Sequence, residues 1–288
     1  MTDALVDEPS APNERRSGGS RHIWFLDGAF DRIDTALAYK RVTEQTAESP
    51  FRFVVTPNVD HLVRLSRASG AEKVLYAQAW LTVCDSRILE LMAKISGEAI
   101  PVAPGSDLTE HLFETAIAPD EPVNVIGGSE AVINAVEARY GLTNLRWYDA
   151  PMGLRRNPFA VGECAAFVAA NPARFTFICV GSPQQEMIAS ACLAREDCFG
   201  VGLCVGASLE FLAGTLTRAP VWMRRARLEW LHRLMSEPTR LWRRYLVEGP
   251  KVVLLWLRWR RQRQALLRLE KELVRHGLDD ASNAQHRR

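Results

Sequence analysis

The sequence predicts an α/β protein: a mainly parallel, Rossmann-like sheet with helices on both faces, followed by a C-terminal helical appendage. Short apolar runs alternate with segments of helical periodicity over most of the chain, which is typical of a parallel sheet covered by helices. Capping residues follow several of these runs. After about residue 217 the strand pattern stops, and the remaining helical stretches are broken by Pro220, Pro238 and Pro250.

The apolar runs predict the strands, and the segments between them predict the helices. The strands are expected near His22–Asp27, Phe51–Thr56, Leu81–Cys84, Val123–Gly127, Leu145–Tyr148, Phe175–Gly181 and Phe199–Cys204. The helices are expected near 34–48, 58–69, 71–79, 86–96, 106–118, 129–140, 160–171, 184–195 and 207–213. Ligands bind such sheets at the carboxyl ends of the strands, so residues that follow strands are the first candidates for a site.

Composition excludes several classes of protein. A chain of 288 residues that is 47% hydrophobic and 24% charged is not mainly disordered, collagen-like or a disulfide scaffold. Its six cysteines form no C-x-x-C pair, so we expect Cys179 and Cys204 to be core residues rather than zinc ligands. We find no signal peptide and no apolar run of about 18 residues, which predicts a cytoplasmic protein that does not span a membrane.

The chain is expected to divide into four parts. They are a disordered leader (1–20), a Rossmann-like core (21–217), a basic helical appendage (218–276) and a disordered tail (277–288). The net charge is +2, but the last 71 residues contain 18 Lys and Arg against 7 Asp and Glu, which leaves −9 on the rest. A cationic segment on an acidic body predicts an anionic partner: a nucleotide, lipid headgroups or nucleic acid.

Polar residues at the ends of the early strands are candidate site residues. Thr56 and Asn58 follow the run FRFVV and could hydrogen-bond a sugar; the alternative is a turn in which Asn58 caps the next helix. Asp85 follows the run WLTVC, where a carboxylate is costly unless it is hydrogen-bonded or used. It is a candidate general base, because reduced solvation raises the pKa of a carboxyl group. The alternative is a cap for the helix that begins near Ser86.

Later strands end in glycines and polar side chains. Gly127 and Gly128 would let a ligand approach the backbone, although a tight turn explains them as well and the full G-x-G-x-x-G fingerprint is absent. Gln185 and Glu186 begin a helix and could contact the sugar or base of a bound substrate. Alternatively, Glu186 satisfies the helix dipole. Glu210, after the last strand, is either an inward polar contact or a surface charge.

The appendage supplies candidate cations. Arg233, Arg240 and Arg243 would share one face of an uninterrupted helix, although Pro238 interrupts it. Guanidinium groups can hold a diphosphate through paired hydrogen bonds; the alternative is a solvated cationic face. The segment VVLLWLRWRRQRQALLRLEKELVR mixes Leu, Val and Trp with six Arg. It could lie in an anionic membrane interface, or pack on the body or on a second subunit.

These motifs resemble the WecG/TagA/CpsF glycosyltransferases, glycosyltransferase family 26. The resemblance covers about residues 23 to 250. TPNVDH, VIGG, G-S-D and V-G-S-P-Q-Q-E occur in the family's order. The segment LAGTLTRAPVWMRRARLEWLHRLMSEPTRLWRRYLVEGP is similar to the family's C-terminal signature.

The resemblance implies an inverting, metal-independent enzyme without a cofactor. It would transfer N-acetylmannosamine or a similar sugar from a UDP donor to an undecaprenyl-diphosphate-linked acceptor in cell-surface or exopolysaccharide biosynthesis. It would act on the inner face of the plasma membrane, and its exposed amphipathic appendage would permit self-association. The implied site residues are the catalytic Asp85, the active-site residues Thr56, Asn58 and Gln185, and the appendage arginines Arg233, Arg240 and Arg243.

The sequence departs from the family's pattern in one motif and at two single positions. The usual P-D-G-x-G is here Cys84-Asp85-Ser86-Arg87-Ile88, so side chains crowd a place where substrate normally approaches the backbone. Val102 stands where Arg is common, and Glu210 where Asp is usual. These departures leave the donor open to a hexose or a uronic acid. A non-catalytic, membrane-associated scaffold of the same fold is an alternative function, and a nucleic-acid-binding module is another, against which the acidic body argues.

Overall fold

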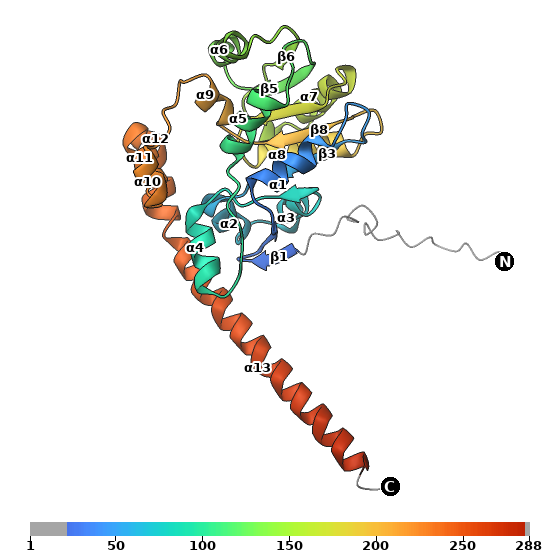
Figure 1. The fold of residues 1–288 in the computed structure, drawn as a ribbon, viewed down its shortest axis with the longest axis vertical. Helices are drawn as coiled ribbons and strands as arrows, with labels where there is room; N and C mark the ends of the chain where they lie inside the picture. Colours follow the sequence, from blue (N-terminus) through green and yellow to red (C-terminus); the bar gives the residue numbers. More distant parts are fainter. Residues whose placement is uncertain (1–21, 286–288) are drawn as a thin grey trace, which may run out of the picture.

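The structure, a computed structural model, describes residues 22–285, so the predicted leader lies outside the described residues. A six-stranded, all-parallel sheet forms the centre, in the strand order β4-β3-β8-β7-β5-β6. Helices cover both of its faces, and a long helix leaves the body toward the C-terminus (Figure 1). The predicted α/β, Rossmann-like fold is therefore confirmed.

The elements of the body follow the predicted order closely. The parallel strands are β3 (Arg52–Val55), β4 (Leu81–Thr82), β5 (Val123–Gly127), β6 (Leu145–Tyr148), β7 (Phe175–Cys179) and β8 (Val201–Cys204). The helices are α1 (Thr35–Thr43), α2 (Val59–Leu65), α3 (Gly70–Ala77), α4 (Arg87–Ile95), α5 (Gly105–Thr115), α6 (Glu130–Tyr140), the 3-10 turn η1 (Leu154–Arg156), α7 (Pro158–Ala170), α8 (Gln184–Leu193) and α9 (Ser208–Leu212).

The central strands are apolar on both faces because helices cover both sides of the sheet. Phe53 and Val55 of β3 pack into one apolar cluster, whereas Val54, between them, packs into the other. All five residues of β5 are buried. This continuous burial explains why the strands appear in the sequence as apolar runs rather than as alternating patterns.

The N-terminal strand differs from the prediction. The segment that was expected to form one strand over His22–Asp27 is the first arm of an antiparallel hairpin, made of β1 (His22–Phe25) and β2 (Gly28–Asp31). Leu26 and Asp27 turn the chain in the left-handed region, with φ values of 53° and 65°. Because Gly28 already pairs with Phe25, Leu26 and Asp27 are the two loop residues of the hairpin, and this pair is not one of the usual Asn-Gly or Asp-Gly signals.

The described segment after residue 217 contains helices and the turns between them, with no strand, as predicted. Its elements are α10 (Val221–Arg225), α11 (Glu229–Ser236), α12 (Pro238–Trp242), a π-helix η2 (Arg243–Glu248) and α13 (Lys251–Gln285). Pro220 precedes α10, Pro238 is the first residue of α12 and Pro250 precedes α13, so the predicted breaks are confirmed. Because α13 continues to Gln285, it covers most of the segment 277–288 that the sequence predicts to be disordered.

The start of α13 packs against the body. Val252 is buried in one of the two apolar clusters of the body. The rings of Trp259 and Phe25 meet edge to face with centroids 4.9 Å apart, and Trp256 Nε1 donates to Ser96 Oγ at 2.8 Å. Over the described part of the chain, no helix has both the length and the apolar character that crossing a bilayer would require.

Candidate active site

A cavity of about 500 Å³ lies at the carboxyl ends of β3, β4 and β8. Its volume is in the usual range for a small-molecule site, about 300–1,000 Å³. The body contributes Asn58, Asp85, Arg87, Ser106 and Ser208, and the helices after residue 217 contribute Arg224, Arg227, Glu229, Trp230, Arg233, Arg244 and Tyr245. Two parts of the chain that are far apart in sequence thus enclose one space.

Asp85 is half-buried in the wall of this cavity, directly before α4. Its backbone N–H donates to Pro57 O at 3.1 Å, which fixes it beside the end of β3. The helix cap is Ser86, whose hydroxyl accepts from Leu89 N at 3.3 Å. Asp85 is therefore not the cap of α4, and its carboxyl group is left for another role.

The environment of Asp85 favours its protonated form. Desolvation raises the pKa of its carboxyl group to about 7, and the negative charges of Glu229 and Asp107 act in the same direction. Arg233 and Arg244 oppose this effect and lower the pKa. The carboxyl group is thus suited to exchange a proton near neutral pH.

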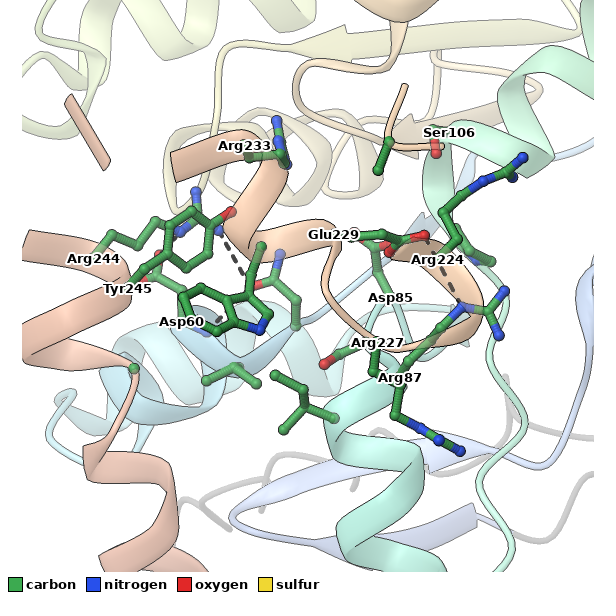
Figure 2. Close-up of a pocket in the computed structure, with 18 of the residues that line it drawn as sticks. Asp60, Asp85, Arg87, Ser106, Arg224, Arg227, Glu229, Arg233, Arg244 and Tyr245 are labelled. Atoms are coloured by element: carbon green, nitrogen blue, oxygen red, sulfur yellow. Dashed lines mark hydrogen bonds and ion pairs between the residues drawn. The ribbon is translucent and has the colours of Figure 1, made fainter. Parts of the chain in front are cut away.

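Positive side chains surround Asp85 on more than one side. In Figure 2, Arg233, Arg244 and Tyr245 lie toward one side of the cavity, and Arg87, Arg224 and Arg227 lie with Asp85 and Glu229 toward the other. Phosphates are bound well by guanidinium groups, whose planar donors match phosphate oxygens. The cavity therefore suits a ligand that carries anionic groups.

Only part of the predicted arginine set faces the cavity. Arg233 lines it and lies over the ring of Phe211, with its guanidinium carbon 5.4 Å from the ring centroid. Arg240 lies outside the lining and forms an ion pair with Glu237, with Nη2 and Oε1 2.7 Å apart. Arg243 also lies outside it, 5.8 Å over the ring of Trp242.

Arg244 is a site residue that the sequence prediction missed. It lines the cavity, donates from Nη2 to Asn58 Oδ1 at 3.4 Å, and places Nε 3.4 Å from Asp60 Oδ2. It thereby joins the π-helix η2 to the end of β3. No motif marked it out from the neighbouring Arg243.

Thr56 and Asn58 occupy different positions at the end of β3. Thr56 is buried, donates to Cys204 O at 3.1 Å, and lies outside the cavity lining. Asn58 lines the cavity and also caps α2, because its Oδ1 accepts from Asp60 N at 3.1 Å. Both interpretations of Asn58, as cap and as cavity residue, are thus compatible with its position.

Gln185 and Glu186 are buried and do not line the cavity. Gln185 is buried, and its Oε1 accepts from Gly206 N at 3.1 Å. Glu186 is fully buried and accepts hydrogen bonds from Ser182, Tyr76 and Gln185. Burial raises the pKa of Glu186, although these hydrogen bonds favour its charged form.

The remaining candidates lie outside the cavity lining. Gly127 and Gly128 form a tight turn with φ values of 85° and 82°, and the Gly127 carbonyl accepts from Trp147 Nε1 at 3.0 Å. Glu210 is half-buried on α9; desolvation raises its pKa, and the charges of Arg240 and Arg233 lower it. Glu210 is thus a partly inward contact.

Among residues 22–269, whose side chains the structure describes, no group of three or more His, Cys, Asp or Glu is arranged to hold a metal ion. The six cysteines are free thiols, and both Cys179 and Cys204 lie in the strands of the sheet. The positive charges found in the cavity are those of the arginines.

Comparison with known families agrees with this arrangement. The model of the glycosyl transferase WecG/TagA/CpsF family matches residues 23–266, which span the sheet, the cavity and the docked part of α13. The match includes both the segment around Asp85 and the helices that cover it. The chain therefore belongs to the WecG/TagA/CpsF family and is a glycosyltransferase of that type.

Proposed function

We propose that the protein transfers a sugar from a UDP-sugar to an acceptor linked to polyprenyl diphosphate, with inversion and without a metal ion. The product would be a cell-surface polysaccharide or an exopolysaccharide. The observation that supports this most directly is the cavity in which one desolvated carboxylate, Asp85, faces arginines from the helices after residue 217. A base and a set of fixed cations are the two components that a single displacement at a sugar phosphate needs.

The proposed reaction is one in-line displacement. The acceptor oxygen forms a bond to the anomeric carbon as the bond from that carbon to the UDP oxygen breaks. Asp85 takes the proton of the acceptor hydroxyl, which its pKa near 7 makes efficient at neutral pH. The pair of electrons leaves with UDP, and its developing charge is stabilised by Arg233 and Arg244.

Thr56 and Gln185 act in this proposal by holding the walls of the site. Thr56 binds the carbonyl of Cys204 at the end of β8, and Gln185 binds the next turn through Gly206 N. That turn continues into Ser208, which lines the cavity. Both residues would thereby fix the loop that faces the donor.

We further propose that α13 brings the site to a membrane that holds the acceptor. The described side chains of α13 include exposed leucines together with several arginines, and the leucines are Leu254, Leu257, Leu266, Leu267 and Leu269. An exposed apolar surface beside cationic side chains binds anionic lipid interfaces. The enzyme would then act at the cytoplasmic face of the plasma membrane.

The test of this function is UDP release from a panel of UDP-sugars in the presence of a short polyprenyl-diphosphate-linked saccharide. Turnover that persists in a chelator is expected for the wild type. Asp85→Asn should abolish turnover while UDP-sugar binding, measured calorimetrically, persists. A folded protein that binds no UDP-sugar, or full turnover by Asp85→Asn, would contradict the proposal.

A further inference from the structure

Apart from Arg233 and Arg244, four arginines line the cavity, and the side chains of three of them make no hydrogen bond to the residues that the structure describes. Arg87 is the first residue of α4, Arg224 belongs to α10, and Arg227 lies between α10 and α11. The proposed mechanism does not use them.

These three side chains have hydrogen-bond donors without a partner. The Nε atom of each is buried and makes no hydrogen bond within the described part of the chain. Arg87 Nε is 4.0 Å from Glu229 Oε1, and Arg227 Nη2 is 4.0 Å from Glu90 Oε2, both beyond hydrogen-bond distance. Among the side chains that the structure describes, residues 22–269, Arg224 has no ion-pair partner. Buried donors are rarely left without an acceptor, which points to acceptor atoms supplied by a ligand.

Arg218 shows what a structural arginine looks like in the same cavity. Its Nη1 donates to Asp107 Oδ1 at 2.8 Å, and its Nη2 donates to Ser106 O at 3.1 Å. Its Nη2 also lies 3.3 Å from Glu110 Oε2. This guanidinium is satisfied by the protein itself, whereas those of Arg87, Arg224 and Arg227 are not.

The backbone at Arg227 adds a second observation. Its φ is 62°, in the left-handed region that favours glycine or asparagine and is uncommon for a long side chain. A glycine would make this turn between α10 and α11 at lower cost. The position instead carries a guanidinium that lines the cavity.

We propose that Arg87, Arg224 and Arg227 form a second anion-binding subsite, which holds a carboxylate or phosphate of a substrate. This inference rests on the proposed function and goes beyond it, because it adds an anionic group distinct from the departing diphosphate at Arg233 and Arg244.

The location of the subsite limits the source of that group. The acceptor hydroxyl and the anomeric carbon must both lie at Asp85. Arg87 is close to this point, because its Nε is 4.0 Å from Oε1 of Glu229, whose charge raises the pKa of Asp85. A group bound beside them belongs either to the transferred sugar or to the acceptor near its reacting hydroxyl. The first source is a carboxylate, as in a uronic acid donor. The second is a phosphate of the lipid-linked acceptor.

Four probes separate these sources: UDP, UDP-glucose, UDP-glucuronate and farnesyl diphosphate, each titrated calorimetrically. The two UDP-sugars differ only in a carboxylate in place of a hydroxymethyl group. The variant is R87Q/R224Q, and R225Q is the control, because Arg225 is exposed in the same helix α10 and lies outside the cavity lining. Melting curves show whether each variant is folded, and R87K/R224K keeps the charges if the Gln variant does not fold.

We expect R87Q/R224Q to bind UDP like the wild type and to lose affinity for one anionic probe by about tenfold or more, since hydrogen bonds to charged groups are lost. Loss for UDP-glucuronate but not UDP-glucose assigns the subsite to the donor's carboxylate. Loss for farnesyl diphosphate alone assigns it to the acceptor's phosphate. R225Q should match the wild type throughout.

Two results would overturn the inference. One is unchanged affinity for all four probes. The other is an equal loss for UDP and both UDP-sugars, because the arginines would then hold the nucleotide's own diphosphate and no second subsite would exist. Failure of the wild-type protein to bind UDP would instead contradict the proposed function, so the two failures are distinguishable.

Discussion

At the scale of single residues, the environment of Asp85 controls the proposed chemistry. Desolvation dominates over the nearby arginines and leaves its pKa at about 7. The sequence alone predicted this direction, because the carboxylate directly follows an apolar run. What the sequence left open was whether Asp85 caps α4, and the structure shows that Ser86 is the cap instead.

A pH–rate profile follows from that pKa. The base must be ionised, so kcat/KM should rise with pH and level off above about pH 7. At about pH 6 we expect roughly a tenth of the plateau value, since a carboxyl group with this pKa is then about one-tenth ionised. The profile is measured by UDP release with the acceptor well below its KM, so that the rate reports the free carboxyl group. A flat profile between about pH 5 and 8 would exclude Asp85 as the base.

The same pKa predicts an effect on stability. Because the pKa rises from 3.8 to about 7 on folding, the folded state binds the proton more tightly, and folding loses free energy as pH rises through this interval. Asp85→Asn removes the penalty. At pH 8 its free energy of unfolding should exceed that of the wild type by at most about 4 kcal/mol, which raises its melting temperature, and the two proteins should match near pH 4. A lower melting temperature at pH 8 would contradict the desolvated carboxylate.

Arg243 and Arg244 give competing predictions. The resemblance to the family implies Arg243, whereas the geometry favours Arg244, which contacts Asn58 and Asp60 at the cavity. We expect Arg244→Gln to lower kcat by about 100-fold, comparable to the loss of one preorganised donor to a developing anion. Arg243→Gln is the matched control and should stay within a few-fold of the wild type. The reverse order would restore the role that the resemblance implies.

The physical reason for this difference is a change in helix winding. The prediction placed Arg233, Arg240 and Arg243 on one face by α-helical spacing. Pro238 instead starts a new helix, and residues 243–248 wind as a π-helix, in which Gly249 N donates to Arg244 O at 2.8 Å. A π-turn shifts the phase only of the side chains after it, so the positions of Arg243 and Arg244 at its start follow from the new helix that begins at Pro238. Local spacing in the sequence cannot predict those positions, because tertiary packing decides them.

At the scale of elements, the sequence predicted those whose signals are local. Strands β5 and β6 have the predicted bounds, since each is an apolar run bounded by turn residues. β4 ends at Thr82, earlier than predicted, because Cys84 pairs with Val102 in an isolated bridge instead of continuing the strand. The docking of α13 was left open among a membrane, the body and a second subunit, and only long-range contacts show that its start packs on the body.

The contact between α13 and the hairpin can be tested on its own. Trp259→Ala removes the edge-to-face contact with Phe25, and it should lower the free energy of unfolding by about 1–3 kcal/mol. Faster hydrogen exchange is expected at the start of α13. Leu266→Ala is the control, because Leu266 is exposed on the same helix. Equal stability of the two variants would contradict the observed docking.

At the scale of the whole molecule, charge and shape divide the chain in the same way. The acidic part is the body that carries Asp85, and the cationic part forms the cover of the cavity and α13. This division was visible in the sequence as a count of charges. The enclosure of the cavity by the two parts was not, because it depends on how the helices after residue 217 fold back over the sheet.

Membrane binding is the prediction that belongs to this scale. We expect the protein to sediment with vesicles that contain an anionic lipid, to bind neutral vesicles weakly, and to lose binding as salt increases. Exchanging Leu266, Leu267 and Leu269 for serine should weaken binding without lowering the melting temperature, since all three are exposed. Unchanged binding by this variant would contradict contact through α13.

The order in which the cavity is assembled has a consequence for biosynthesis. Asp85 and the strands of the sheet precede residue 205, whereas the lining contributed from Arg218 to Val253 is translated after them. Domains generally begin to fold while the ribosome is still at work, starting from the N-terminal side. A nascent chain that ends before residue 218 would therefore contain the folded sheet and an incomplete, inactive cavity. The active site would become complete only when residues 218–253 have been synthesised and have packed over the sheet.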